Sequence, residues 1–151
     1  MKNKFLSIFS NIRNKYFPDN ETGYQSFSQA GEDMIIRFLL SSLKIKEGKY
    51  IDIGAHHPLK FSNTHYLYKS GWKGINVEAN PLLLKEFFKK RDKDINLNIG
   101  IMDERGILDF YLISASTLST FSKEEADNLV NQFGFKIVQK IQIPTDTIMN
   151  I

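Results

Sequence analysis

Three short apolar runs, each ending in a polar turn, stand in the middle of the chain. They cover residues 50–55, 74–78 and 95–101, and the segments between them carry apolar side chains at helical spacing. Short apolar runs bounded by turn residues are typical of strands that are buried on both faces of a sheet. The order strand, helix, strand, helix, strand therefore predicts a parallel sheet of the α/β class.

Capping residues mark where the helices are expected to begin. The three expected starts are Ser28, then Ser62 or Asn63, and finally Asn80 with Pro81 as the first helical residue. The side chains expected to face the core are Ile35, Phe38, Leu39 and Leu43 in the first helix and Leu83, Leu84, Phe87 and Phe88 in the third. The basic residues expected at the negative end of the third helix are Lys89, Lys90 and Arg91.

The last third of the chain predicts a hairpin, a helix and one more strand. Residues 103–106 are expected to form the turn that joins the third strand to a strand over residues 107–113. Ser122 and Glu125 have the spacing of a capping box and predict a helix after them. Alternating apolar and polar side chains then predict a half-exposed strand over residues 135–143.

Charge divides the chain into residues 1–24 and a domain over residues 25–151. The formal net charge is +3, and four cations without any acid lie within the first 17 residues, so the remainder sums to −1. Apolar residues at helical spacing among those cations are compatible with an amphipathic helix in weak contact with an anionic membrane surface through residues 1–17. A flexible or loosely docked segment explains the same pattern, and we favour it.

The composition excludes several kinds of protein. The chain has no cysteine, which excludes disulfides, thiol catalysis and cysteine-ligated metals. The near-neutral domain lacks the basic patch that nucleic-acid binding requires, and no apolar run reaches the roughly 18 residues that span a bilayer. Adjacent His56 and His57 project apart, so we expect no metal site. These features predict a cytoplasmic protein.

Two carboxylates stand at the ends of the first two expected strands, where ligands bind in open α/β sheets. Glu78 follows Gly54 at about the separation at which Rossmann-like sites place an acid on ribose hydroxyls. Gly54 is a single glycine where a dinucleotide site needs three, so a nicotinamide-dependent oxidoreductase is disfavoured. A nucleoside without phosphates fits, and S-adenosylmethionine does so with its positive charges served by acids such as Asp52. Alternatively, Glu78 is a surface carboxylate and Asp52 a structural cap.

Several separate motifs resemble those of one family. In chain order they are Ser28–Asp33, Tyr50–Pro58, Ser62–Tyr68, Gly71–Gly74, Val77–Pro81, Asn98–Ile101 and Leu118–Ser122. Over residues 27–145 the chain resembles the FkbM-type methyltransferases. The resemblance implies a Rossmann-like class I domain that transfers a methyl group from S-adenosylmethionine to a hydroxyl oxygen. Sugars of surface polysaccharides or secondary-metabolite intermediates would be the acceptors.

The resemblance also implies roles for individual residues. The loop under the methionine end of the cofactor would be formed by Asp52, Gly54, Ala55 and His56. The ribose would be held by Glu78, and the adenine would lie beside Ala79 with Ile101 and Met102 on its other face. The stretch Leu118–Ser122 could line an acceptor cleft, and no residue is assigned as the catalytic base.

Class I domains of this kind have seven strands in the order 3-2-1-4-5-7-6. The chain is expected to supply strands 1 to 3, an inserted hairpin and the strand near residues 135–143, and thus the cofactor half of a C-terminally incomplete domain. The fourth strand would pair with the first, so we expect an open sheet edge that binds a partner chain, and an inactive chain in isolation. The alternative is a non-catalytic remnant or a split subunit that binds a nucleoside or a partner.

Overall fold

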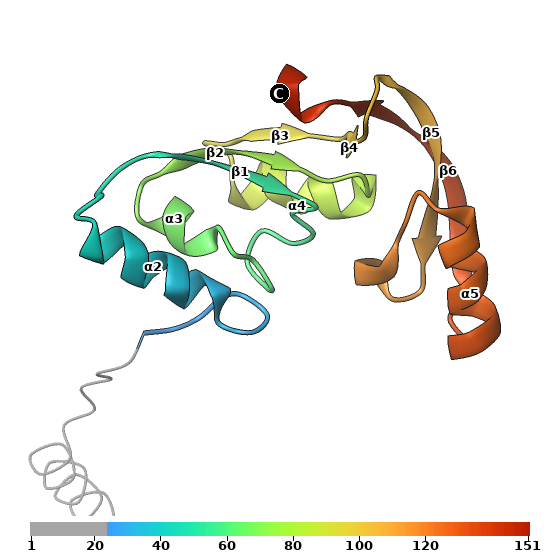
Figure 1. Cartoon of the computed structure of the whole chain (residues 1–151), viewed down its shortest axis with the longest axis horizontal. Coiled ribbons are helices and arrows are strands. Elements are labelled where there is room, and N and C mark those ends of the chain that lie inside the picture. The colour runs from blue at the N-terminus through green and yellow to red at the C-terminus, as the bar shows by residue number, and fades with distance from the viewer. Residues whose placement is uncertain (1–23) are drawn as a thin grey trace, which may run out of the picture.

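The computed structural model of the protein describes residues 24–151 (Figure 1). The N-terminal segment predicted over residues 1–24 lies outside them apart from Tyr24, and so does its predicted membrane contact. In the described part, two three-stranded sheets stand side by side, and helices cover one face of the first sheet (Figure 1). Between residues 24 and 151, every helix is too short or too polar to cross a membrane.

The first sheet is the parallel one that the apolar runs predict. Its strands lie in the order β1-β2-β3, and a helix follows each of the first two strands. The elements are β1 (Lys49–Ile53), α3 (His65–Lys69), β2 (Lys73–Val77), α4 (Pro81–Lys90) and β3 (Ile95–Leu97). This arrangement confirms the α/β class and brings the carboxyl ends of β1 and β2 to one edge of the sheet.

Helix α4 begins and packs largely as predicted. The Asn80 side chain caps its first turn, accepting a hydrogen bond from the backbone two residues on at 3.0 Å. Leu84 and Phe87 are buried and pack against Ala55, which follows β1. Phe88 is 58 % exposed, so the core face of α4 is narrower than the sequence predicted.

Helix α2 (Glu32–Ser42) begins later than Ser28, where its start was predicted. Gly31, with a φ of 93°, occupies the N-cap position, and the Ser28 hydroxyl accepts a hydrogen bond from the Gly31 N–H at 3.0 Å. The predicted core stripe of α2 is exposed, with Phe38 at 69 %. An apolar stripe of a helix is buried only where another element packs against it. Within residues 24–151, no element covers the stripe of α2.

Helix α3 lacks the side-chain cap predicted at Ser62 or Asn63. Its N-cap is Thr64, whose side chain makes no capping hydrogen bond. The Ser62 and Thr64 hydroxyls instead accept hydrogen bonds from Arg91, at 2.7 and 3.0 Å. The prediction is wrong because a tertiary contact uses the side chains that the local pattern assigned to the helix terminus.

The second sheet has the order β4-β6-β5, which contradicts the predicted hairpin. Its strands are β4 (Gly100–Ile101), β5 (Gly106–Ile113) and β6 (Ile137–Asp146), and α5 (Lys123–Phe133) lies between β5 and β6. Strand β5 pairs with β6 in antiparallel direction, and β4 pairs with the other side of β6 in parallel direction. The predicted third strand therefore splits in two at Asn98. There the side-chain amide of Asn98 donates to the Glu78 and Ala79 carbonyls at 2.8 and 2.9 Å. After this residue the chain leaves the first sheet and enters the second.

Strand β1 forms one edge of the first sheet. Among residues 24–151, no strand pairs with its outer side. Its side chains Ile51 and Ile53 are 49 % and 52 % exposed. An unpaired edge with apolar side chains is a template for pairing with a further strand.

Candidate functional site

Glu78 lies directly after β2, at the edge where the carboxyl ends of the parallel strands meet. Its carboxylate accepts two hydrogen bonds from backbone N–H groups, Oε2 from His56 and Oε1 from Asn80, both at 2.7 Å. Burial raises the pKa of Glu78, and the hydrogen bonds from Asn80 and His56 oppose that rise. The side chain is thus a fixed and buried acceptor rather than a surface carboxylate.

The loop after β1 turns sharply at Gly54. This residue has a φ of 68°, in the left-handed region that favours glycine. The N–H groups of Gly54 and Ala55 both donate to the Val77 carbonyl, at 2.9 and 3.0 Å. His56 follows with a φ of 53°, which is uncommon for a residue with a side chain. Its imidazole Nε2 lies 3.0 Å from Ser116 Oγ, so the loop is tied both to β2 and to the segment after β5.

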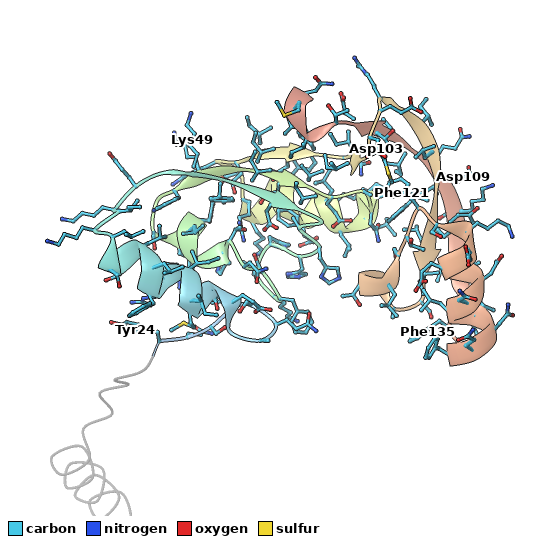
Figure 2. The ribbon with its side chains drawn as sticks, in the orientation of Figure 1. Tyr24, Lys49, Asp103, Asp109, Phe121 and Phe135 are labelled. Atoms are coloured by element: carbon cyan, nitrogen blue, oxygen red, sulfur yellow. The ribbon has the colours of Figure 1, made fainter. Side chains whose placement is uncertain are left out.

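A cavity of about 670 Å³ opens between this edge of the first sheet and the second sheet. Six predicted site residues line it, namely Gly54, His56, Glu78, Ala79, Ile101 and Met102. The opposite wall comes from the 3₁₀ turn η1 (Ser116–Leu118) and the residues after it. Figure 2 shows Phe121 of this wall in the angle between the two sheets, where its ring packs on Phe110 at a centroid distance of 4.6 Å. The cavity is in the size range of small-molecule sites.

Two predicted site residues do not line this cavity. The Ala55 side chain points into the core and packs against α4. The Asp52 carboxylate accepts a hydrogen bond from the Thr64 hydroxyl at 2.5 Å. Burial raises the pKa of Asp52, and the Thr64 hydrogen bond and the charge of Arg91 oppose the rise. Asp52 thus lies in β1, just before the loop that lines the cavity, and its carboxylate is bound to Thr64.

The two histidines after Gly54 have different partners. His57 turns back to its own loop, where its Nδ1 accepts hydrogen bonds from the Leu59 and Lys60 N–H groups, both at 3.0 Å. Burial, together with the charges of His56 and Lys60, lowers the pKa of His57. Within the described range, no three His, Asp or Glu side chains gather as metal ligands would.

Sequence reasoning missed part of the cavity wall. The side chains that it did not assign to the site include Gln29, Phe61, Ser116 and Thr117. The hydroxyl-rich stretch of residues 116–122 offered a signal, although only Leu118–Ser122 was considered for an acceptor cleft. Phe61, with a φ of 54°, carries no comparable signal in the local pattern.

Nearly all residues that build the site fall within one family model. The model, described as Methyltransferase FkbM domain, matches residues 52–151, which is well over half of the chain. This range contains Asp52, Glu78, every residue that lines the cavity except Gln29, and the whole second sheet. Comparisons with curated proteins and with solved structures found no match. The chain therefore belongs to the FkbM methyltransferase domain family.

Proposed function

We propose that this chain binds S-adenosylmethionine in the cavity beside Glu78, in a Rossmann-like class I domain, and serves methyl transfer to a hydroxyl oxygen of a sugar or another metabolite. The observation that carries the proposal is the Glu78 carboxylate, which is buried, held by two backbone N–H groups and open to the cavity. The methyltransferase family supports this choice of donor, because such enzymes generally use S-adenosylmethionine.

The loop beside Glu78 favours a nucleoside without phosphates. The N–H groups of Gly54 and Ala55 are bound to the Val77 carbonyl, and that of His56 is bound to Glu78. These groups are therefore not free to bind a pyrophosphate, as the N–H groups of glycine-rich dinucleotide loops do. Glu78 keeps acceptor capacity, since a carboxylate offers about four lone-pair sites and only two are used by the backbone. The remaining sites suit the vicinal hydroxyls of a ribose.

The other walls suit the remaining parts of the donor and an acceptor. Ala79, Ile101 and Met102 offer apolar surface to a flat base. S-adenosylmethionine supplies, when bound, a methyl group on a positively charged sulfur. The Asp52 carboxylate adds negative charge at the start of the loop, where that positive end would lie. The hydroxyl side chains of residues 116–120 offer hydrogen bonds to a hydroxylated acceptor.

Calorimetric titration with S-adenosylhomocysteine tests the role of Glu78. We expect the wild type to bind it and to lose about tenfold or more in affinity, ~1.4 kcal/mol, when either ribose hydroxyl is replaced by hydrogen. Glu78→Gln keeps the size of the side chain but not its charge, so it should bind weakly and barely distinguish the deoxy ligands. NAD serves as the control and should bind to neither protein. Undiminished affinity in a folded Glu78→Gln variant would contradict the proposal.

A second candidate function is a nucleoside-binding subunit that needs another chain for catalysis. It is favoured by the unpaired edge of β1, on which Ile51 and Ile53 are half exposed. Transfer of a labelled methyl group from S-adenosylmethionine to polyhydroxylated acceptors separates the two candidates. Transfer by the chain alone supports the enzyme, whereas saturable binding without transfer supports the subunit.

A further inference from the structure

Arg91 is fully buried at the end of α4, although the sequence placed it among the cations that balance the helix dipole. All five of its N–H groups donate hydrogen bonds. Nε and Nη2 donate to the Pro58 carbonyl at 3.0 and 2.8 Å, Nη2 donates to Ser62 Oγ at 2.7 Å, and Nη1 donates to the Tyr50 and Thr64 hydroxyls at 3.1 and 3.0 Å. A guanidinium held in this way cannot turn, so it fixes the loop between β1 and α3.

Thr64 passes the effect of Arg91 on to Asp52. Its oxygen accepts a hydrogen bond from Arg91 Nη1, and its O–H donates to Asp52 Oδ2 at 2.5 Å. A hydroxyl that accepts from a cation donates more strongly to an anion. The other Asp52 oxygen, Oδ1, receives no hydrogen bond from any residue between 24 and 151. One oxygen is thus held in place, and the other has no partner among these residues.

Burial and the neighbouring carboxylates act against the ionisation of Asp52, and Thr64 and Arg91 favour it. Burial raises the pKa of Asp52, and the Thr64 hydrogen bond and the Arg91 charge oppose the rise. Asp94, whose Oδ2 lies 3.8 Å from Arg91 Nη1, adds a like charge. Glu78 is a further carboxylate within the influence of Asp52. Without the Thr64 hydroxyl, burial and the charges of Asp94 and Glu78 would all disfavour the charged form of Asp52, and only the Arg91 charge would favour it. Asp52 would then take up a proton at a higher pH.

We propose that Thr64 is a positioning residue for the donor site: its hydroxyl, held by Arg91, orients the Asp52 carboxylate and keeps it negatively charged toward the positive end of S-adenosylmethionine. This inference rests on the proposed function and adds to it a residue outside the cavity that makes donor binding depend on pH. Ser62 supplies a matched control, because its hydroxyl binds the same guanidinium at 2.7 Å while the hydrogen bond to Asp52 comes from Thr64.

The titration of Asp52 in the ligand-free protein tests the first half of the proposal. It can be followed by NMR of ¹³C-labelled aspartate and assigned with Asp52→Asn. We expect Thr64→Val to raise the pKa of Asp52 by about one unit, because the hydroxyl favours the charged form. Thr64→Ser keeps the hydroxyl and should restore the wild-type pKa, and Ser62→Ala should leave it unchanged. Thr64→Ala takes the place of Thr64→Val if circular dichroism shows that the latter does not fold.

Titrations with S-adenosylhomocysteine across pH test the second half. From about pH 8 to about pH 5.5, the affinity of Thr64→Val should fall roughly threefold to tenfold more than that of Ser62→Ala. The proposal is overturned if the Asp52 pKa does not move in Thr64→Val, or if it moves equally in Ser62→Ala. If the wild type binds no S-adenosylhomocysteine at any pH, the proposed function fails, while the Asp52 titration still decides whether Thr64 controls this carboxylate.

Discussion

His65, a single buried residue, should make the stability of this domain fall in mild acid. It begins α3 with its ring edge-on to Phe27, at a centroid distance of 4.5 Å. Burial, together with the charges of Arg91 and Lys69, lowers its pKa from 6.5 to about 4. The unfolded chain takes up this proton near pH 6.5, so the stability that neutral His65 contributes is complete only above that pH. As the pH falls toward about 4, this contribution is lost at up to about 1.4 kcal/mol per pH unit.

Urea unfolding of the wild type and His65→Gln, at about pH 7 and about pH 5, measures this loss. Asp52 and Glu78 act in the opposite direction, because their raised pKa values let the folded state take up protons before the unfolded one does. Both carboxylates remain in the variant, so the difference between the two proteins isolates His65. We expect the wild type to lose more stability than His65→Gln. Equal losses would show that the folded domain accepts the His65 proton without penalty.

Among single residues, the sequence predicted those that follow the strand ends and line the cavity. It missed the residues that hold the neighbouring loop and Asp52 in place. Glu78 and Gly54 follow directly from the two apolar runs, and both line the cavity. Arg91 and Thr64 carry no comparable local signal. Arg91 binds Pro58, which lies 33 positions earlier, and only the folded sheet brings the two together. Hydrogen bonds of such long range leave no periodicity or spacing in the sequence from which to infer them.

The cap of α4 lets the stability of an element be separated from the chemistry of the site. Asn80 caps the helix with its side chain and binds Glu78 through its backbone N–H. Asn80→Ala removes the cap and keeps the N–H, so we expect a loss of about 1 kcal/mol in the free energy of unfolding. The affinity for S-adenosylhomocysteine should stay within about twofold of the wild type, because Glu78 keeps both of its hydrogen bonds. Chemical denaturation and calorimetry measure the two quantities.

Asn80→Ser provides the matched control, since serine caps a helix about as well as asparagine and should restore the stability. Ser122→Ala removes the corresponding cap of α5, in which Ser122 Oγ accepts from the Glu125 N–H at 3.2 Å, and should cost a similar amount. A large loss of affinity in Asn80→Ala would mean that the helix terminus, rather than the backbone N–H, holds Glu78 in place.

The elements were largely predictable from the sequence, and their pairing was not. Apolar runs and caps located β1, β2 and α4, because these signals act within a few neighbouring residues. The pairing of β5 with β6 spans an intervening helix, and residues 103–106, the last of which begins β5, close no hairpin. The alternation of a strand identifies its buried face, but not its neighbour in the sheet. Ile101 and Met102 of the cavity wall were predicted as site residues, whereas the position of η1 on the opposite wall could not be inferred from the local pattern.

At the scale of the whole molecule, the cavity lies between two sheets that come from different stretches of the chain (Figure 1). The connection is short: the Asn98 amide binds the carbonyls at the end of β2, and the Met102 N–H donates to the Asp146 carbonyl of β6 at 3.0 Å. The wall of residues 100–102 is thus bound to the second sheet and lines the same cavity as Glu78. A donor held by both would couple the two sheets.

Hydrogen exchange with and without saturating S-adenosylhomocysteine tests this coupling. We expect slower amide exchange in residues 54–56 and in residues 100–102, because a ligand that bridges the sheets opposes their local opening. Helix α5 is the internal reference, and residues 116–120 should follow it, since the proposed function leaves their hydroxyls to the acceptor. Protection of residues 54–56 alone would show that the adenine does not contact β4. Equal protection of residues 116–120 would mean that the donor fills the whole cavity, and an acceptor would then have to approach from outside it.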